Sequence, residues 1–179
     1  GKTTDGAYQA MLEVARNREP KVGWVLSPSY QMSEVPERDF AEIARSAIRN
    51  VRKDNGRRIY EMVNGHRVEF KTADDPDRLR GERLAWCWMD EAAQMPKYVW
   101  DVILGRILTF KGKVFITTTP CGRNWLYDEV YLPSCPDWIH RDEDYSCVRA
   151  TSWENPYLDP VEVDKLRRKY PGTLAAQEL

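Results

Sequence analysis

Three short apolar segments, each followed by polar residues, most constrain how this chain of 179 residues can fold. They cover residues 22–26, 84–89 and 113–117. Segments this short and continuous, separated by helical patterns, indicate strands that are buried on both faces. The sequence therefore predicts an α/β fold with a mainly parallel sheet flanked by helices.

The remaining elements follow from periodicity and turn residues. Apolar residues at helical spacing, with Asp159-Pro160 as a helix start, predict helices over residues 7–18, 36–53, 98–108 and 159–170, and the beginning of another at 172–179. Asn64-Gly65 lies between strand-like residues 59–63 and 66–70, which predicts a β-hairpin with a type I′ turn. A further strand is expected at residues 148–151.

Composition excludes several classes of protein. Apolar residues make up 42% and charged residues 31% of the chain, as in an ordinary globular domain. No apolar run approaches the ~20 residues of a membrane span, and no signal peptide is visible, so a secreted or membrane protein is not expected. Lysine and arginine number 27 against 28 acidic residues, which excludes a general basic coat for nucleic acid but allows a local patch.

The cysteines and histidines do not form a metal-binding pattern. No two of the four cysteines, Cys87, Cys121, Cys135 and Cys147, have C-x-x-C spacing. A zinc site is therefore not expected, and free thiols fit a reducing compartment. Of the two histidines, His66 stands beside the hairpin turn and is expected to be exposed.

Polar residues with chemical potential stand at the chain start and after two of the apolar segments. Gly1-Lys2-Thr3 matches the last three positions of the P-loop pattern, whose Lys reaches phosphate oxygens and whose Thr holds Mg²⁺. Asp90-Glu91 and Thr117–Pro120 follow segments expected to end at the ligand-binding edge of the sheet. Each has an ordinary alternative: a chance tripeptide, acidic residues that begin a helix, or a polar turn. Their occurrence together, in this order, makes nucleotide hydrolysis the leading hypothesis.

The order and spacing of these motifs resemble the ATPase domain of tailed-phage terminase large subunits. The resemblance covers nearly the whole chain and rests on Gly1-Lys2-Thr3, Asn64-Gly65, Arg78-Leu-Arg80-Gly81, the residues from Trp88 to Ala93, Thr117–Pro120 and Asn155-Pro-Tyr157. It implies a P-loop NTPase fold of the additional-strand catalytic glutamate type, with a β-hairpin before the Walker B strand. In that family a strand precedes the P-loop, and this strand and most of the P-loop are not in the sequence.

The resemblance assigns roles to individual residues. It implies ATP binding by Gly1, Lys2, Thr3, Thr4 and, after the first apolar segment, Gln31. Mg²⁺ would be held by Thr3 and by Asp90 of the Walker B motif.

Further roles concern hydrolysis and its coupling to movement. Glu91 would be the catalytic glutamate that orients water against the γ-phosphate. Thr118 and Thr119 would form the coupling motif. Arg80 is the candidate arginine finger supplied to a neighbouring subunit, with Arg78 and Arg83 as competitors.

At the level of the whole protein, the resemblance implies a viral DNA-packaging motor. Residues 1–150 would form the ATPase core and 151–179 a helical extension leading to a nuclease domain outside this sequence. The implied partners are double-stranded DNA, a homo-oligomeric ring, the small terminase subunit and the portal protein, in the host cytoplasm. Two alternatives stay open: a helicase-type DNA translocase, and a scaffold that does not hydrolyse ATP.

Two further features have structural interpretations. The basic run over residues 165–169 fits a solvated helix face better than a contact with the DNA backbone. Trp86 and Trp88 are expected to pack against the helices that cover the sheet.

Overall fold

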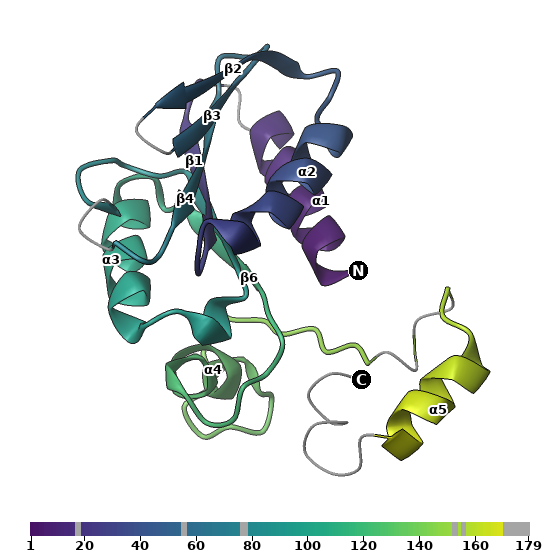
Figure 1. Cartoon of the computed structure of the whole chain (residues 1–179). Coiled ribbons are helices and arrows are strands. Elements are labelled where there is room, and N and C mark those ends of the chain that lie inside the picture. The colour runs from purple at the N-terminus through teal and green to yellow at the C-terminus, as the bar shows by residue number, and fades with distance from the viewer. Residues whose placement is uncertain (17–18, 55–56, 76–78, 152–153, 155–156, 170–179) are drawn as a thin grey trace. The chain divides into compact units, whose positions relative to one another are not determined.

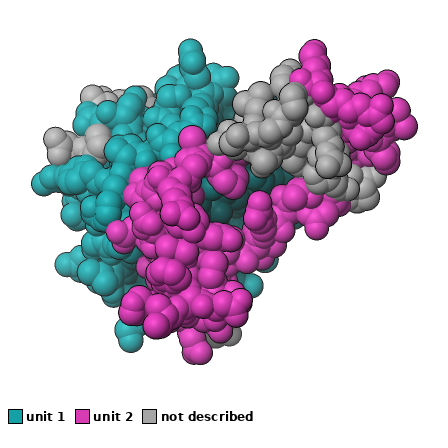
Figure 2. Space-filling view, turned by 90° about the horizontal axis from the view of Figure 1, so that it is seen from below, with its two compact units in different colours: residues 1–118 teal, residues 119–179 magenta. Residues whose placement is uncertain are grey.

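The computed structural model describes residues 1–16, 19–54, 57–75, 79–151, 154 and 157–169. The chain divides into two compact units, residues 1–118 and residues 119–179, which are coloured separately in Figure 2. Each unit is considered by itself.

The first unit is built on a six-stranded sheet with the order β2-β3-β4-β1-β5-β6. The strands are β1 (Val22–Ser27), β2 (Ile48–Asp54), β3 (Arg57–Met62), β4 (Arg67–Thr72), β5 (Trp86–Asp90) and β6 (Lys113–Thr117). Strands β4, β1, β5 and β6 are parallel neighbours, whereas β2 and β3 extend the sheet in antiparallel fashion. The expected α/β fold, with its parallel core and a hairpin before β5, is confirmed.

Helices cover both faces of this sheet (Figure 1). Helices α1 (Lys2–Arg16) and α2 (Glu34–Ile43) lie side by side on one face, and α3 (Lys97–Ile107) lies on the other. Three short 3₁₀ turns follow strands or helices: η1 (Gln31–Ser33), η3 (Ala92–Gln94) and η4 (Leu108–Phe110). The arrangement explains why the apolar segments lack alternation, since both faces of the parallel strands are buried.

The core beneath α1 and α2 contains both tryptophans of β5. Trp86 is 1% exposed and Trp88 is fully buried, and both belong to one cluster with Ala7, Ala10 and Phe40 from the two helices. Their expected packing against the covering helices is confirmed. This burial fixes the position of β5 under the start of α1.

The hairpin at Asn64-Gly65 is confirmed, but its turn is not of type I′. Only Gly65 takes a positive φ (83°), whereas a type I′ turn needs two such residues. His66 is 1% exposed, so its expected exposure is wrong. The turn packs toward the end of α1, where Asn64 Nδ2 donates to the Val14 carbonyl (3.0 Å), and the Lys21 amide donates to His66 Nδ1 (3.2 Å).

The expected helix over residues 36–53 is partly wrong. Helix α2 ends at Ile43, and residues 48–54 form the edge strand β2 instead. The register between β2 and β3 shifts between Ile48 and Asn50, so that Ile48 opposes Met62 and Val51 opposes Tyr60. This β-bulge places two apolar residues three positions apart on the same face of the sheet, a spacing that imitates a helix.

The second unit is mainly helical in the part that the structure describes. It contains a π-helical turn η5 (Tyr127–Tyr131), the short helix α4 (Leu132–Ser134) and helix α5 (Pro160–Lys169). Asp159 caps α5 as expected, since its Oδ1 accepts a hydrogen bond from the Val161 amide (2.8 Å). The strand expected at residues 148–151 is absent, because this segment has no neighbouring strand and Val148 is 94% exposed.

Other expectations for this unit have mixed outcomes. On α5, Lys165 and Arg168 are exposed and pair with acidic residues of the same helix, as a solvated face requires. Tyr170 and residues 172–179 lie outside the described residues. The division into a core of residues 1–150 and an extension of residues 151–179 stays a prediction. None of the helices in the described part of the chain has the length and apolar character of a transmembrane span.

Candidate active site

The site forms where α1 begins and β5 ends. Lys2 Nζ lies 3.4 Å from Glu91 Oε1, although the two residues are far apart in the sequence. Asp90, the last residue of β5, stands beside Glu91 at the carboxyl end of the parallel strands. The structure therefore brings together one amine and two acids that the sequence analysis had selected.

Asp90 is held in a buried position. It is 4% exposed, and its Oδ1 accepts a hydrogen bond from the Thr117 hydroxyl at 2.6 Å. Burial raises the pKa of Asp90 to about 6, and the Thr117 hydrogen bond partly offsets this rise. Because desolvation dominates, a cation next to this carboxylate would stabilise its charged form.

Glu91 differs from Asp90 in both backbone and exposure. It adopts the left-handed conformation (φ 51°, ψ 43°), and its amide donates to the Thr117 carbonyl at 2.6 Å. For a residue with a Cβ this conformation costs about 1–2 kcal/mol. The backbone turns at this point, and the Glu91 side chain remains 21% exposed. Glu91 is thus accessible to solvent, whereas Asp90 is enclosed.

The end of β6 lies next to these acids. Thr118 Oγ1 accepts a hydrogen bond from the Ala93 amide (3.1 Å), which links the predicted coupling motif to η3. Thr119 is the first residue of the second unit, so its place relative to Glu91 stays a prediction. Sequence analysis did not select Thr117, although Thr117 pairs with Asp90 in the strand register.

The first turn of α1 supplies the other predicted ligands. Thr3 is half-buried, and Gly1 contributes its carbonyl to the Asp5 amide (3.0 Å). The Thr4 hydroxyl donates to Asp39 Oδ2 of α2 at 3.0 Å, so Thr4 ties the two helices together. Asp39 is a second residue that sequence analysis missed, since nothing in its local pattern indicates that α2 passes the start of α1.

Gln31 and the arginines occupy other segments. Gln31 begins η1, which follows β1, and its side chain is exposed. Arg80 donates through Nη2 to the Tyr98 hydroxyl, and its guanidinium carbon lies 5.9 Å from the Tyr98 ring centroid. Arg83 is exposed, and Arg78 lies outside the described residues. The structure therefore places Arg80 against α3 and leaves its suggested role to experiment.

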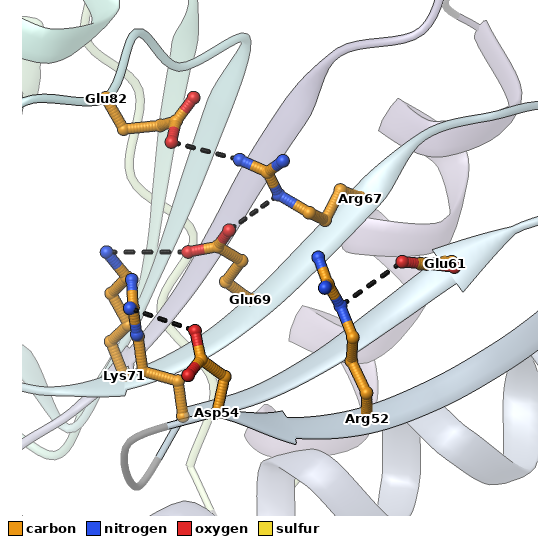
Figure 3. Close-up of polar contacts among 8 residues, drawn as sticks. Arg52, Asp54, Glu61, Arg67, Glu69, Lys71 and Glu82 are labelled. Carbon is orange, nitrogen blue, oxygen red and sulfur yellow. Dashed lines mark hydrogen bonds and ion pairs between the residues drawn. The ribbon is translucent and has the colours of Figure 1, made fainter.

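The loop that carries Arg80 is anchored through a row of charges shown in Figure 3. Arg67 Nη2 lies 3.0 Å from Glu82 of the loop, and Arg67 Nε lies 2.6 Å from Glu69 of the same strand. Lys71 Nζ lies 3.5 Å from the other oxygen of Glu69 and 3.5 Å from the Trp24 ring centroid. Glu69 and Lys71 are buried, so this end of the loop is attached to a fixed part of the sheet.

The side chains at the site suit Mg²⁺ better than a softer metal. Asp90 and Thr3 offer hard oxygen donors, which Mg²⁺ prefers. Among the residues that the structure describes, no three histidine, cysteine, aspartate or glutamate side chains gather as a closed metal cage. Mg²⁺ typically uses one or two carboxylates together with substrate phosphates and water, and Asp90 alone fits that pattern.

This architecture is that of P-loop NTPase folds: a parallel sheet, a helix that begins with Gly-Lys-Thr, and acidic residues at a neighbouring strand end. The chain belongs to the family described as terminase large subunit, T4likevirus-type, N-terminal, whose profile matches residues 1–179. It is 30% identical to the terminase large subunit of Thermus virus P23-45 over 152 residues. That match covers 72% of this chain and 30% of the relative, so the chain spans about a third of that protein's length.

Solved structures share the fold. The large terminase ATPase domain of Thermus phage P74-26 is 26% identical, with a TM-score of 0.75 over 99% of this chain and 82% of that one. The large terminase of another thermophilic bacteriophage, in complex with ATP-gamma-S, has a TM-score of 0.71 over 97% of this chain and 42% of that one. At 15% identity, the second comparison supports the fold alone.

Proposed function

We propose that this chain is the ATP-hydrolysing part of a viral DNA-packaging motor. The observation that carries the proposal is the contact of Lys2 with Glu91, directly beside the buried Asp90. A family whose solved relatives include an ATPase domain and a complex with ATP-gamma-S supports the same function.

In this proposal the start of α1 receives the phosphates of ATP. Lys2 neutralises their charge, and the amides of the first helical turn donate hydrogen bonds, aided by the helix dipole. Gly1, Thr3 and Thr4 belong to this phosphate contact, and Gln31 approaches the nucleotide from the end of β1.

Asp90 and Glu91 have different tasks because their environments differ. Asp90 is enclosed and fixed by Thr117, which suits a ligand of Mg²⁺, together with Thr3. When bound, Mg²⁺ would neutralise charge that develops on the phosphate oxygens. Glu91 is reachable by solvent, which suits a carboxylate that orients a water molecule toward the γ-phosphate.

Coupling and activation involve residues around this centre. Thr118, hydrogen-bonded to the backbone of η3, and Thr119 would link the phosphate state to movement of DNA. Arg80 would act as an arginine finger on a neighbouring subunit and stabilise the charge of the transferred phosphoryl group.

The wider role is proposed from the family. It includes double-stranded DNA as the translocated partner, a homo-oligomeric ring, contacts with the small terminase subunit and the portal, and action in the host cytoplasm. Nuclease activity is expected only of a separate C-terminal domain. Family membership favours this interpretation over a helicase-type translocase, and the scaffold alternative is decided by experiment.

The test is Glu91→Gln in the full-length protein. ATP turnover should fall by at least about 100-fold, the usual contribution of a group that orients or deprotonates a nucleophile. ATP binding, measured by thermal shift with Mg·ATP, should persist because the amide keeps the side chain's size. Glu61→Gln on β3, where Glu61 pairs with Arg52, is the matched control and should leave turnover unchanged. Normal turnover in Glu91→Gln, or no ATP binding by the wild-type protein, would contradict the proposal.

A further inference from the structure

We propose that Trp88 and Thr117 are positioning residues that hold the Asp90 carboxylate in one orientation for a Mg²⁺–nucleotide complex. The inference rests on the proposed function, in which Asp90 is a Mg²⁺ ligand. It adds two residues that contact neither metal nor nucleotide in that proposal.

A chain of two short hydrogen bonds connects these side chains. Trp88 Nε1 donates to Thr117 Oγ1 at 2.7 Å, and Thr117 Oγ1 donates to Asp90 Oδ1 at 2.6 Å. The strand register allows this chain, because Asp90 of β5 stands directly opposite Thr117 of β6.

The chemistry of the three groups fixes the direction of the chain. An indole N–H can only donate, so the Thr117 oxygen must be the acceptor for Trp88. The single hydroxyl proton of Thr117 is then directed to Asp90, whose ionised carboxylate can only accept. One Asp90 oxygen is occupied in this way, and the other is left for a cation.

The first donor in this chain cannot easily move. Trp88 is fully buried and its ring is stacked on Phe115, with an interplanar angle of 17°. Gly6 of α1 lies directly over the indole, so close that a Cβ at this position would stand 2.2 Å from Trp88 Cε2. The helix that carries Lys2 thus rests on the same indole that orients Asp90.

Such indirect partners normally have measurable effects on metal binding. Removing a group that orients a metal ligand typically reduces metal affinity by about 10–100-fold. Thr117→Val keeps the shape of the side chain and removes only the hydroxyl, and Thr117→Ser restores the hydroxyl.

The first experiment measures the affinity of the full-length protein for a fluorescent ADP analogue, in EDTA and across a Mg²⁺ titration. We expect Thr117→Val to raise the Mg²⁺ concentration at half-effect by about 10-fold, with the affinity in EDTA unchanged. Thr117→Ser should restore the wild-type value. Equal losses with and without Mg²⁺ would show a structural role and overturn the inference.

Trp88→Phe provides the second test, with Trp86→Phe as its matched control. Both tryptophans are buried in the same strand and on the same face, but only Trp88 has its indole nitrogen bonded to Thr117. We expect the Mg²⁺ requirement to rise in Trp88→Phe and to stay unchanged in Trp86→Phe. Because Trp88 acts through Thr117, Trp88→Phe should add little to the effect of Thr117→Val. Equal or additive effects would contradict the chain.

A third measurement leaves the protein unaltered and is independent of variant folding. The indole N–H proton resonance of Trp88, identified by its loss in Trp88→Phe, should shift when Mg·ADP is added but not when ADP is added in EDTA. No Mg²⁺-dependent shift would overturn the inference.

Asp90→Asn separates this inference from the proposed function. If Asp90→Asn leaves the Mg²⁺ dependence of nucleotide binding intact, the proposed role of Asp90 is wrong. If Asp90→Asn abolishes that dependence while Thr117→Val and Trp88→Phe do not shift it, only the positioning chain is wrong.

Discussion

Two neighbouring acids acquire different properties from their immediate surroundings. Asp90 ends a buried strand and is hydrogen-bonded, whereas Glu91 begins a left-handed turn and reaches solvent. The left-handed backbone at Glu91 is an observed outlier of the kind that clusters at functional sites. Chemical type alone would have made these two carboxylates equivalent.

His66 shows how a single buried side chain makes stability depend on pH. Burial lowers the pKa of His66, and nearby Lys21 lowers it further. The folded state therefore binds this proton less readily than the unfolded chain, whose histidine has a pKa of about 6.5. Stability present above about pH 6.5 is lost as the pH falls toward the folded-state pKa, by at most about 1.4 kcal/mol per pH unit.

The prediction is checked with urea denaturation between pH 7.5 and 6. His66→Asn, whose Oδ1 can replace Nδ1 as the acceptor for the Lys21 amide, should flatten the pH dependence. His140→Asn, at the other histidine of the chain, is the control and should leave it unchanged. The same slope in all three proteins would contradict the assignment.

Elements of this fold depend on a few turn positions as well as on periodicity. Gly65 allows β3 to return as β4, because its φ of 83° lies in a region that disfavours residues with a Cβ. A Cβ at Gly65 would also stand 3.0 Å from Pro20 Cγ. The hairpin in turn positions β4, which anchors the loop of Arg80 through Arg67 and Glu82.

We expect Gly65→Ala to reduce the free energy of unfolding by about 1–2 kcal/mol, the cost of forcing a left-handed backbone on alanine. Gly105→Ala, in the exposed interior of α3, should instead raise it by about 0.5–1 kcal/mol, because no atom lies within 4 Å of a Cβ there and alanine favours the helix. Urea denaturation measures both. Equal effects of the two substitutions would show that backbone conformation does not control the hairpin.

At the scale of the whole molecule, the proposed motor requires more than one copy of this chain. Arg80 is exposed, and the loop around it is tied to the sheet and to Tyr98 of α3. A guanidinium held at the surface in this way is suited to reach a site on a neighbouring subunit.

This prediction is tested by mixing two inactive full-length variants, Arg80→Ala and Glu91→Gln. If Arg80 acts in trans, a subunit with an intact Glu91 receives Arg80 from its neighbour, so the mixture should recover part of the turnover. Arg83→Ala is the matched control and should remain active alone. No recovery on mixing would indicate that Arg80 acts within its own subunit or has another role.

Much of the candidate site was predictable because it follows strand ends. Apolar segments followed by Asp90-Glu91 and by Thr117–Pro120 indicated one sheet edge, and β5 and β6 do end side by side there. Thr117 and Asp39 were missed since their roles depend on which strand or helix lies opposite. The helix expected over residues 36–53 was wrong in its second half, because a bulge that only strand pairing reveals produced a helical spacing.

The sequence by itself determined the layered α/β class and the residues able to bind phosphate and metal, since burial on both faces and turn chemistry are local properties of the chain. Tertiary structure decided which of these residues meet. The Lys2–Glu91 contact and the Trp88–Thr117–Asp90 chain depend on strand order, register and the close approach of α1 to β5, and those arise from packing between segments distant in sequence.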